Sequence, residues 1–160
     1  MSTQGPGKGK ELKIVTRHVV TIDQVKGDES KVKLLHTIKA YGEISEKALQ
    51  YLVYEMKEAG VDLGYDFTVI GNVPFSKKLR EDIVALLYVG LLETNPKNKK
   101  LRVTSMALSD FLPTVPLPED DSKKIEEAVE QLRSKVAAID AEVELAAMLG
   151  RRGRRRRRRF

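Results

Sequence analysis

Residues 76–93 read SKKLREDIVALLYVGLLE, and this stretch decides the fold. Ser76 is a favoured helix N-cap, and apolar residues then recur at helical spacing as far as Gly90. Glycine is favoured just beyond the last turn of a helix, so we expect a helix between these two residues. Its buried residues should be Leu79, Ile83, Leu86 and Leu87.

A β-hairpin should follow this helix directly. Residues 91–94 and 100–104 have the composition of short strands, and the segment Asn95-Pro96-Lys97-Asn98-Lys99 between them is typical of a turn. Residues 105–111 are then expected to form one more short helical turn.

Two more helices are predicted further upstream. The first should run from a turn at residues 27–30 to about Tyr41 and stop at Gly42, and the second should begin at the N-cap Ser45 and end at Gly60. Their buried residues should be Val32, Leu34, Leu35 and Ile38 in the first helix, and Leu49, Leu52, Val53 and Met56 in the second.

The remaining N-terminal segments are less regular. Residues 61–75 are strand-like and interrupted by glycine, and they are longer than an ordinary helix-turn-helix turn. Residues 12–22 place Val, Ile, Thr and Leu at alternating positions, which predicts a strand. Residues 1–10 contain no apolar stretch, and we expect them to be disordered.

A proline-rich linker over residues 113–118 should separate this region from a long helix over 119–149. The helix carries a heptad pattern, formed by Ile125, Val129, Leu132, Val136, Ile139, Val143 and Ala146. β-Branched residues at the a positions favour parallel two-stranded pairing, so a homodimer through this helix is expected. The alternative that remains open is that the helix packs back on its own domain.

The basic charge is concentrated at the C-terminus. Residues 151–160 hold eight arginines and no acid, so the 29 basic and 23 acidic residues of the whole chain reduce to 21 and 23 over residues 1–150. Self-repulsion should keep the tail, residues 150–160, disordered until a polyanion neutralises it. Eight phosphate contacts would give a log–log salt slope of about −7. The residues concerned are Arg151, Arg152, Arg154, Arg155, Arg156, Arg157, Arg158 and Arg159. The alternatives are a solvated solubility tail and a segment read by a transport receptor.

The expected order of strand, three helices and hairpin, over about residues 13–104, resembles the winged-helix superfamily. The resemblance rests on residues 76–93, the basic hairpin after them and the segment Arg102-Val103-Thr104. In that superfamily the third helix commonly ends in a Gly-Leu-hydrophobic step, and a threonine after the second wing strand caps the next helix. With its long C-terminal helix, the chain is most similar to small prokaryotic regulators of the phenolic-acid-regulator type, which dimerise through such a helix. The fold class is therefore expected to be α+β, mostly α, with a winged-helix domain over residues 11–112, a long helix and a disordered basic tail.

The resemblance implies a DNA-contacting surface on the third helix and the wing. The helix would present Lys77, Lys78 and Arg80, and the wing would present Lys97, Lys99, Lys100 and Arg102. The competing interpretation is a solvated charged face, because Glu81 and Asp82 lie beside these cations and no set of base-reading residues follows them.

Catalytic chemistry is not indicated. The chain has no cysteine, and only His18 and His36 as histidines, so we expect no metal site, no cofactor and no enzymatic activity. The glycine- and lysine-rich segment 5–10 fails as a phosphate loop because no strand precedes it. No apolar run reaches the roughly 18 residues of a membrane span, so no membrane partner is expected.

The leading hypothesis is a nucleic-acid-binding winged-helix protein, either a DNA-binding transcriptional regulator or a chromatin-associated protein. The first alternative is a ribosomal or other ribonucleoprotein component whose tail threads RNA, and the second is a protein-interaction module. Asn and Gln together number seven while Lys and Glu are abundant, a bias typical of thermophile proteins, so a prokaryotic and archaeal source is expected. We expect a cytoplasmic protein associated with the nucleoid or the ribosome.

Overall fold

Polar caps and glycines set the bounds of three helices, α3 (Glu29–Tyr41), α4 (Glu46–Glu58) and α5 (Lys77–Tyr88). The computed structural model describes the backbone of residues 21–159 and the side chains of residues 21–150. Asp28, Ser45 and Ser76 each accept a backbone N–H with the side chain at the helix start. Gly42 and Gly90 follow α3 and α5 with φ of 110° and 84°, values that a side chain would strain. The helix predictions for this region are confirmed.

The chain before α3 differs from the prediction where it is described. Residues 22–26 form a short helix, α2 (Ile22–Lys26), and not the end of a strand. The reason is a capping box: the Thr21 hydroxyl accepts from the Gln24 N–H, and the Gln24 side chain accepts from the Thr21 N–H. The rest of the predicted strand, and the segment 1–10, lie outside the described residues.

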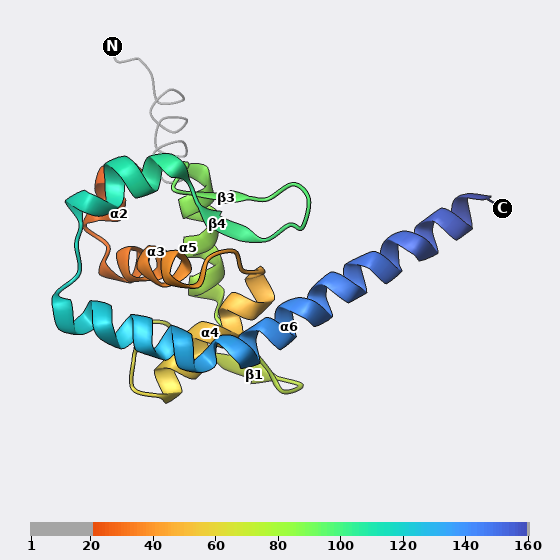
Figure 1. Cartoon of the computed structure of the whole chain (residues 1–160), viewed down its shortest axis with the longest axis horizontal. Helices are drawn as coiled ribbons and strands as arrows, with labels where there is room; N and C mark the ends of the chain where they lie inside the picture. Colours follow the sequence, from red (N-terminus) through yellow and green to blue (C-terminus); the bar gives the residue numbers. More distant parts are fainter. Residues whose placement is uncertain (1–20, 160) are drawn as a thin grey trace, which may run out of the picture.

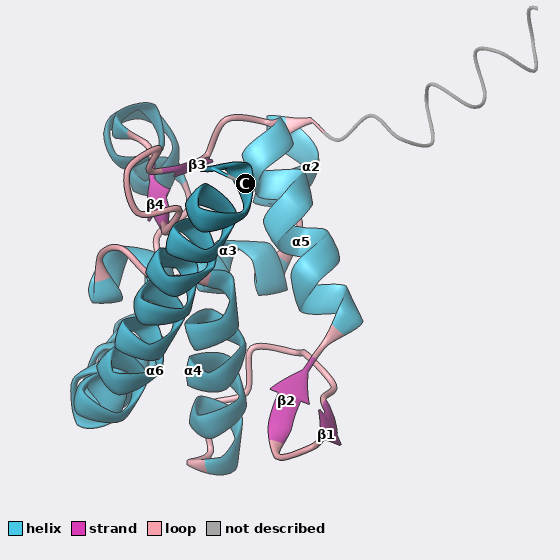
Figure 2. Cartoon of the chain, turned by 90° about the vertical axis from the view of Figure 1, so that its right-hand side faces the viewer, coloured by secondary structure: helices cyan, strands magenta, loops and turns pink. Residues whose placement is uncertain are grey.

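Two antiparallel hairpins flank α5. The first, β1 (Thr68–Ile70) with β2 (Val73–Phe75), lies between α4 and α5, and the second, β3 (Leu92–Thr94) with β4 (Leu101–Val103), follows α5. Figure 2 shows the two hairpins at opposite ends of the molecule. Ile44, between α3 and α4, exchanges two backbone hydrogen bonds with Leu101 and so adds a third strand contact beside β4. This mostly helical α+β arrangement is compatible with a winged helix.

The core lies between α3, α4 and α5. Every buried residue expected in the three helices is buried except Leu87, which is partly exposed. Side chains outside the helices complete the core, namely Ile44, Leu63, Tyr65, Leu91 and Leu101. Burying each large aliphatic side chain contributes roughly 1.5–3 kcal/mol, so this cluster holds the three helices in one arrangement.

After β4, Thr104 accepts from the Ala107 N–H and begins the expected helical turn. The turn is a π-helix, η1 (Ala107–Phe111), and a 3-10 helix, η2 (Leu112–Thr114), continues it into the first residues of the expected linker. Helix α6 (Glu119–Arg159) then starts at the predicted residue and extends past the expected end at 149. The side chains of residues 151–160 lie outside the described part of the chain, so the disorder of the tail stays a prediction.

The first half of α6 packs on α3 and α4, and the second half projects away from the body (Figure 1). Among the expected dimerisation residues, Ile125, Val129 and Val136 are buried in the chain's own core, Leu132 and Ile139 pack against it, and Val143 is half-buried. The heptad stripe therefore packs on its own domain, the alternative that the sequence left open. A dimer through this stripe would require α6 to leave α3 and α4.

Polar contacts fix α6 to the connection between α3 and α4. The Asp140 carboxylate is 4% exposed and accepts the backbone N–H of Ser45 at 2.9 Å and the Tyr41 hydroxyl at 3.4 Å. About two turns earlier, Arg133 donates to the backbone carbonyls of Tyr41 and Ala40 and lies over the Tyr41 ring. Asp140 makes the last of these buried polar contacts, and one turn later the ion pair between Glu144 and Lys100 joins α6 to the hairpin before the helix projects from the body.

Candidate nucleic-acid interface

Three cations occupy the first turn of α5, where the sequence predicts phosphate contacts. Lys77 is exposed and forms no ion pair within the described residues. Lys78 pairs with Asp82 at 2.6 Å, and Arg80 lies 3.9 Å from a carboxylate oxygen of Glu46. The partial positive charge at the start of the helix adds to the field of Lys77. Lys77 is therefore the cation at this end of α5 that has no acidic partner among the described residues.

Asp82 belongs to a buried polar network. Its carboxylate is 1% exposed, accepts from the Tyr65 hydroxyl at 2.7 Å, and pairs with Lys31 at 3.2 Å as well as with Lys78. Burial, and then the hydrogen bond to Asp82, raise the pKa of Tyr65 far above its ordinary value. A buried carboxylate requires such partners, so the pairing of Lys78 with Asp82 contributes to the stability of the fold.

The rest of the exposed face of α5 is apolar or acidic. Val84 and Tyr88 are 57% and 66% exposed, and Glu81 lies one turn before Val84. Arg, Asn and Gln are the side chains that usually read base edges in the major groove, and this face has none beyond Arg80. The helix therefore offers apolar contact in the position where a reader of DNA sequence offers hydrogen bonds.

The β3–β4 hairpin carries four predicted cations, and the structure separates them into two pairs. Lys97 and Lys99, in the turn, are exposed and form no ion pair within the part of the chain that the structure describes. Lys100 pairs with Glu144 of α6 at 2.6 Å, which raises its pKa through that hydrogen bond. Arg102 pairs with Glu93 at 2.7 Å and with Glu43 at 3.2 Å. Only the tip of the hairpin has cations available for phosphate.

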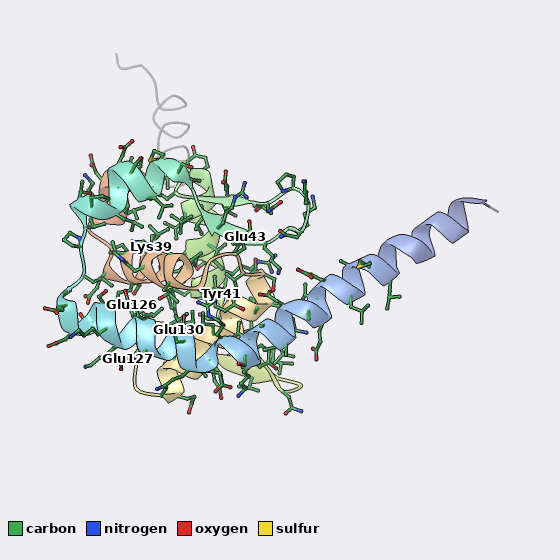
Figure 3. All side chains as sticks on the ribbon, viewed as in Figure 1. Lys39, Tyr41, Glu43, Glu126, Glu127 and Glu130 are labelled. Carbon is green, nitrogen blue, oxygen red and sulfur yellow. The ribbon has the colours of Figure 1, made fainter. Side chains whose placement is uncertain are left out.

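Glu43 holds the hairpin against the α3–α4 connection (Figure 3). Its carboxylate accepts from the side-chain amides of Asn95 and Asn98 at 3.0 and 3.1 Å and also pairs with Arg102. The Asn95 hydrogen bond, followed by that of Asn98, lowers the pKa of Glu43 below its ordinary value. The two asparagines also cap the turn, because Asn95 Oδ1 accepts from the Lys97 N–H and Asn98 Oδ1 from the Lys100 N–H.

Sequence analysis missed these acidic partners. Glu43 lies more than fifty positions before Arg102, Glu144 lies more than forty after Lys100, and no local pattern relates them. The i,i+4 spacing of Lys78 and Asp82 is a signal that the sequence does contain. Among the seven cations of α5 and the hairpin, those left exposed and unpaired in the described region are Lys77, Lys97 and Lys99.

The arginine-rich segment occupies the far end of α6. Asp140 is the last buried residue of this helix within residues 119–150, and at 1.5 Å per residue the backbone at residue 151 lies about 16 Å further along the helix axis. Figure 1 shows this end of the helix well separated from every other element. Negative and positive charge are therefore segregated, with the acidic body at one end of α6 and the arginines at the other.

The described residues hold no group of three or more His, Cys, Asp or Glu side chains that could bind a metal ion. Among those residues, no helix has the length and apolar composition of a membrane span. His36 is half-buried, and its Nε2 lies 3.1 Å from the Val115 carbonyl.

No family model matches the chain, and comparisons with curated proteins and with solved structures also found no match.

Proposed function

We propose that the chain is a nucleic-acid-binding protein of the winged-helix type, in which the arginine-rich end of α6 supplies phosphate affinity and the body supplies placement. The observation that carries the proposal is the segregation of charge along α6. A helix end with eight arginines stands clear of a body that has net negative charge, so a polyanion reaches the arginines without approaching the acids.

The winged-helix part of the proposal is supported by the order of elements. Helices α3, α4 and α5 are followed by the β3–β4 hairpin, and Ile44 bridges to β4 in the position of an additional strand. Thr104 caps the turn after the hairpin. In this arrangement Lys77, at the start of α5, and Lys97 and Lys99, at the tip of the β3–β4 hairpin, each add a smaller contribution to that of the tail. A DNA-binding regulator or chromatin-associated protein is the first form of this function.

A second form is a ribonucleoprotein or protein-interaction component, and the exposed face of α5 favours it. Val84 and Tyr88 offer apolar contact area in place of base-reading groups. The pairing of Lys78, Lys100 and Arg102 also reduces the number of unpaired cations on α5 and the hairpin. In this form the body docks on protein and the tail binds RNA.

A salt titration of binding tests the proposal. The full chain and a 1–150 truncation are compared on random duplex DNA and on total ribosomal RNA. For the full chain we expect a log–log slope of about −7 or steeper. For the truncation we expect a slope of no more than about −3, from the three exposed and unpaired lysines of α5 and the hairpin, Lys77, Lys97 and Lys99. A chain with all eight tail arginines changed to lysine is the control for charge, and should keep most of the slope. Equal affinity of the full and truncated chains would contradict the proposal.

The contribution of the body is measured within the truncated chain. Lys97→Gln with Lys99→Gln should reduce the remaining affinity for duplex DNA by roughly tenfold in low salt. The matched control is Lys26→Gln with Lys39→Gln, which removes the same charge from exposed residues of α2 and α3. If both pairs of substitutions have the same effect, the hairpin does not contact phosphate and the second form of the function is favoured.

A further inference from the structure

The β1–β2 hairpin carries exposed aliphatic side chains at its tip. Val69 and Ile70 are 52% and 70% exposed, and Val73 is 37% exposed. Ile70 lies directly opposite Val73, so these two side chains share one face of the hairpin, and Val69 lies on the other face. Gly71 and Asn72 both have positive φ and join the strands in a two-residue turn. The hairpin therefore ends in a narrow apolar tip, formed by Val69, Ile70 and Val73.

Hydrogen bonds hold this hairpin in place against α4 and the start of α5. The Tyr51 hydroxyl donates to the Asn72 carbonyl at 2.8 Å. The Gln50 side chain accepts from the Ser76 N–H at 2.8 Å and donates to the Ser76 carbonyl at 3.2 Å. The fold therefore fixes the apolar tip in solvent, and an apolar group held in this way is typical of a contact surface.

The bases beside the hairpin favour an anionic partner. Lys77 lies two residues after β2, and Lys47 lies on the same face of α4 as Gln50 and Tyr51. Both lysines are exposed, and neither forms an ion pair within residues 21–150. The two lysines therefore offer charge for an anionic group at the base of the hairpin.

The acids of this region are partnered or lie further from the tip. Asp66, just before β1, pairs with Lys57 at 3.4 Å. Glu46 lies 3.9 Å from Arg80, and Glu81 is one turn beyond Lys77 on α5, which runs away from the hairpin. The hairpin itself, residues 68–75, contains no charged residue. An anion that approaches the tip therefore meets apolar groups first and lysines next.

The size of the apolar tip distinguishes between partners. A specific protein interface uses about 20–30 residues on each side, far more than this tip supplies. Three short aliphatic side chains also bury less apolar surface than a single acyl chain, which by itself binds a membrane only marginally. A DNA duplex differs, because one or two apolar side chains inserted between base pairs are enough to unstack them and bend the helix.

We propose that the β1–β2 hairpin is a wedge that inserts Ile70 and Val73 between adjacent base pairs of duplex DNA from the minor groove. Lys47 and Lys77 then contact the flanking phosphates. The inference rests on the proposed function, because the arginine-rich end of α6 supplies the phosphate affinity that brings the duplex to the body. Figure 2 shows this hairpin at the start of α5 and apart from the β3–β4 hairpin, so the wedge is a separate contact.

A preference for DNA that is already unstacked tests the wedge. The full chain is titrated against two short duplexes of the same sequence, one intact and one with a central bulge of unpaired bases. Because the bulge removes the need to unstack base pairs, we expect roughly tenfold tighter binding to the bulged duplex. Ile70→Thr with Val73→Thr keeps the β-branched shape and should reduce this ratio to about two or less. Equal affinity of the unchanged protein for both duplexes, or a ratio that the threonine pair leaves unchanged, would overturn the proposal.

Two further variants keep the test specific to the tip. Val84→Thr with Leu108→Thr changes exposed aliphatic residues of α5 and η1 and should leave the ratio unchanged. Ile70→Met retains an apolar side chain of the kind that intercalates and should keep the preference. The urea midpoint of each variant should match that of the unchanged protein. Equal losses of the ratio in the two threonine pairs would show that the preference does not come from the hairpin.

Bending of the DNA gives a readout that does not depend on affinity. Energy transfer between dyes at the two ends of the intact duplex should rise when the unchanged protein binds, because a wedge kinks the helix. With the threonine pair bound at saturation, the transfer should stay close to its value in free DNA. Equal bending by both proteins would contradict a wedge at Ile70 and Val73.

The phosphate contacts are tested by charge. Lys47→Gln with Lys77→Gln should weaken binding to both duplexes by roughly tenfold in low salt and leave their ratio unchanged. The matched control, Lys26→Gln with Lys39→Gln, should weaken binding by no more than about threefold. Equal effects of the two pairs would remove the phosphates from the base of this hairpin.

The outcomes separate the wedge from the function on which it rests. A full chain that binds neither duplex would contradict the proposed function and the wedge together. A full chain that binds both duplexes equally, with no effect of the threonine pair, would overturn the wedge alone. Vesicles of phosphatidylserine are the probe for a lipid surface. If the threonine pair abolishes co-sedimentation with these vesicles and leaves DNA binding unchanged, the tip contacts a membrane and the wedge is overturned.

Discussion

The two halves of α6 differ in environment although their sequences have the same period. Residues 119–140 lie on α3 and α4 and bury Ile125, Val129 and Val136, whereas residues 141–159 project from the body. The heptad pattern continues through both halves, at Val143 and Ala146. A repeat of this kind shows which face of a helix is apolar. It does not show whether that face meets the same chain or another one.

The boundary between the halves is set by polar contacts. Arg133 and Asp140 attach α6 to the last turn of α3 and to the cap of α4. After residue 140 the helix contains the half-buried Val143 and forms the Lys100–Glu144 ion pair with the hairpin. Exposed ion pairs contribute little, typically below about 1 kcal/mol, while a buried hydrogen-bonded carboxylate is costly to disrupt. The first half of α6 should therefore be part of the cooperative fold, and the second half should not.

The largest difference in the free energy of unfolding is expected between two variants that each introduce an aspartate, one in the packed half of α6 and one in the projecting half. Val129→Asp puts an unpaired carboxylate into the core and should destabilise the protein by about 3 kcal/mol or more. Leu145→Asp, on an exposed position, should change the free energy of unfolding by no more than about 0.5 kcal/mol. Urea unfolding at low protein concentration measures both. Equal losses would mean that the distal half also belongs to the folded core.

The next contrast concerns the acids on either side of the boundary. Asp140→Ala leaves the Ser45 N–H without its partner and should cost about 1–3 kcal/mol. Glu142→Ala removes an exposed carboxylate and should cost no more than about 0.5 kcal/mol. The comparison is made by thermal and urea unfolding. If Asp140→Ala proves neutral, the attachment at the α3–α4 connection is not what fixes the end of the packed half.

Hydrogen exchange should separate the halves without any substitution. Amides of the packed half should exchange only on global unfolding, while those after residue 144 should exchange through local fraying. Gly150→Ala is expected to slow exchange around residues 145–155, since alanine stabilises a helix interior by about 1 kcal/mol relative to glycine and the added methyl group meets nothing within 4 Å. The urea concentration at the midpoint of unfolding should be the same for the Gly150→Ala variant as for the unchanged protein. A raised midpoint would place the distal half in the cooperative unit.

The smallest expected effect is a pH dependence at the entry to α6. Burial lowers the pKa of His36, whose Nε2 meets the Val115 carbonyl in the linker before this helix. A lowered pKa in the folded state means that the unfolded state binds the proton more readily, so this stability is complete above about pH 6.5 and decreases as the pH falls below it. His36→Gln should flatten unfolding curves measured between pH 5 and pH 7. An unchanged pH dependence would show that His36 is not its source.

Local signals predicted most of the body. Ser45 and Ser76 are N-caps, Gly42 and Gly90 follow helix ends, and Asn95 to Lys99 form the predicted turn, because each of these depends on neighbouring residues alone. The prediction of a strand as far as Ile22 was wrong at its end, because the capping box at Thr21 starts a short helix there. The β1–β2 hairpin was visible only as a strand-like stretch, since its register is set by Gly71 and Asn72, which both have positive φ.

The candidate interface was predicted less well than the fold. Lys100 and Arg102 have the composition of a phosphate-binding hairpin, yet Glu144 and Glu43 neutralise them across the tertiary structure. Lys97 and Lys99, at the tip of the hairpin, are exposed and form no ion pair among the described residues. Counting cations in a loop therefore overestimates the positive field that a ligand meets.

The sequence by itself determined the helix limits, the hairpin after α5 and the separation of eight arginines from an acidic body, because caps, turns and charge are properties of short segments. Only the tertiary structure decided that the heptad stripe of α6 is buried against α3 and α4, and which cations of α5 and the hairpin stay free. The physical reason is distance: burial and ion pairing depend on residues forty to a hundred positions apart, and their proximity exists only once the chain has folded.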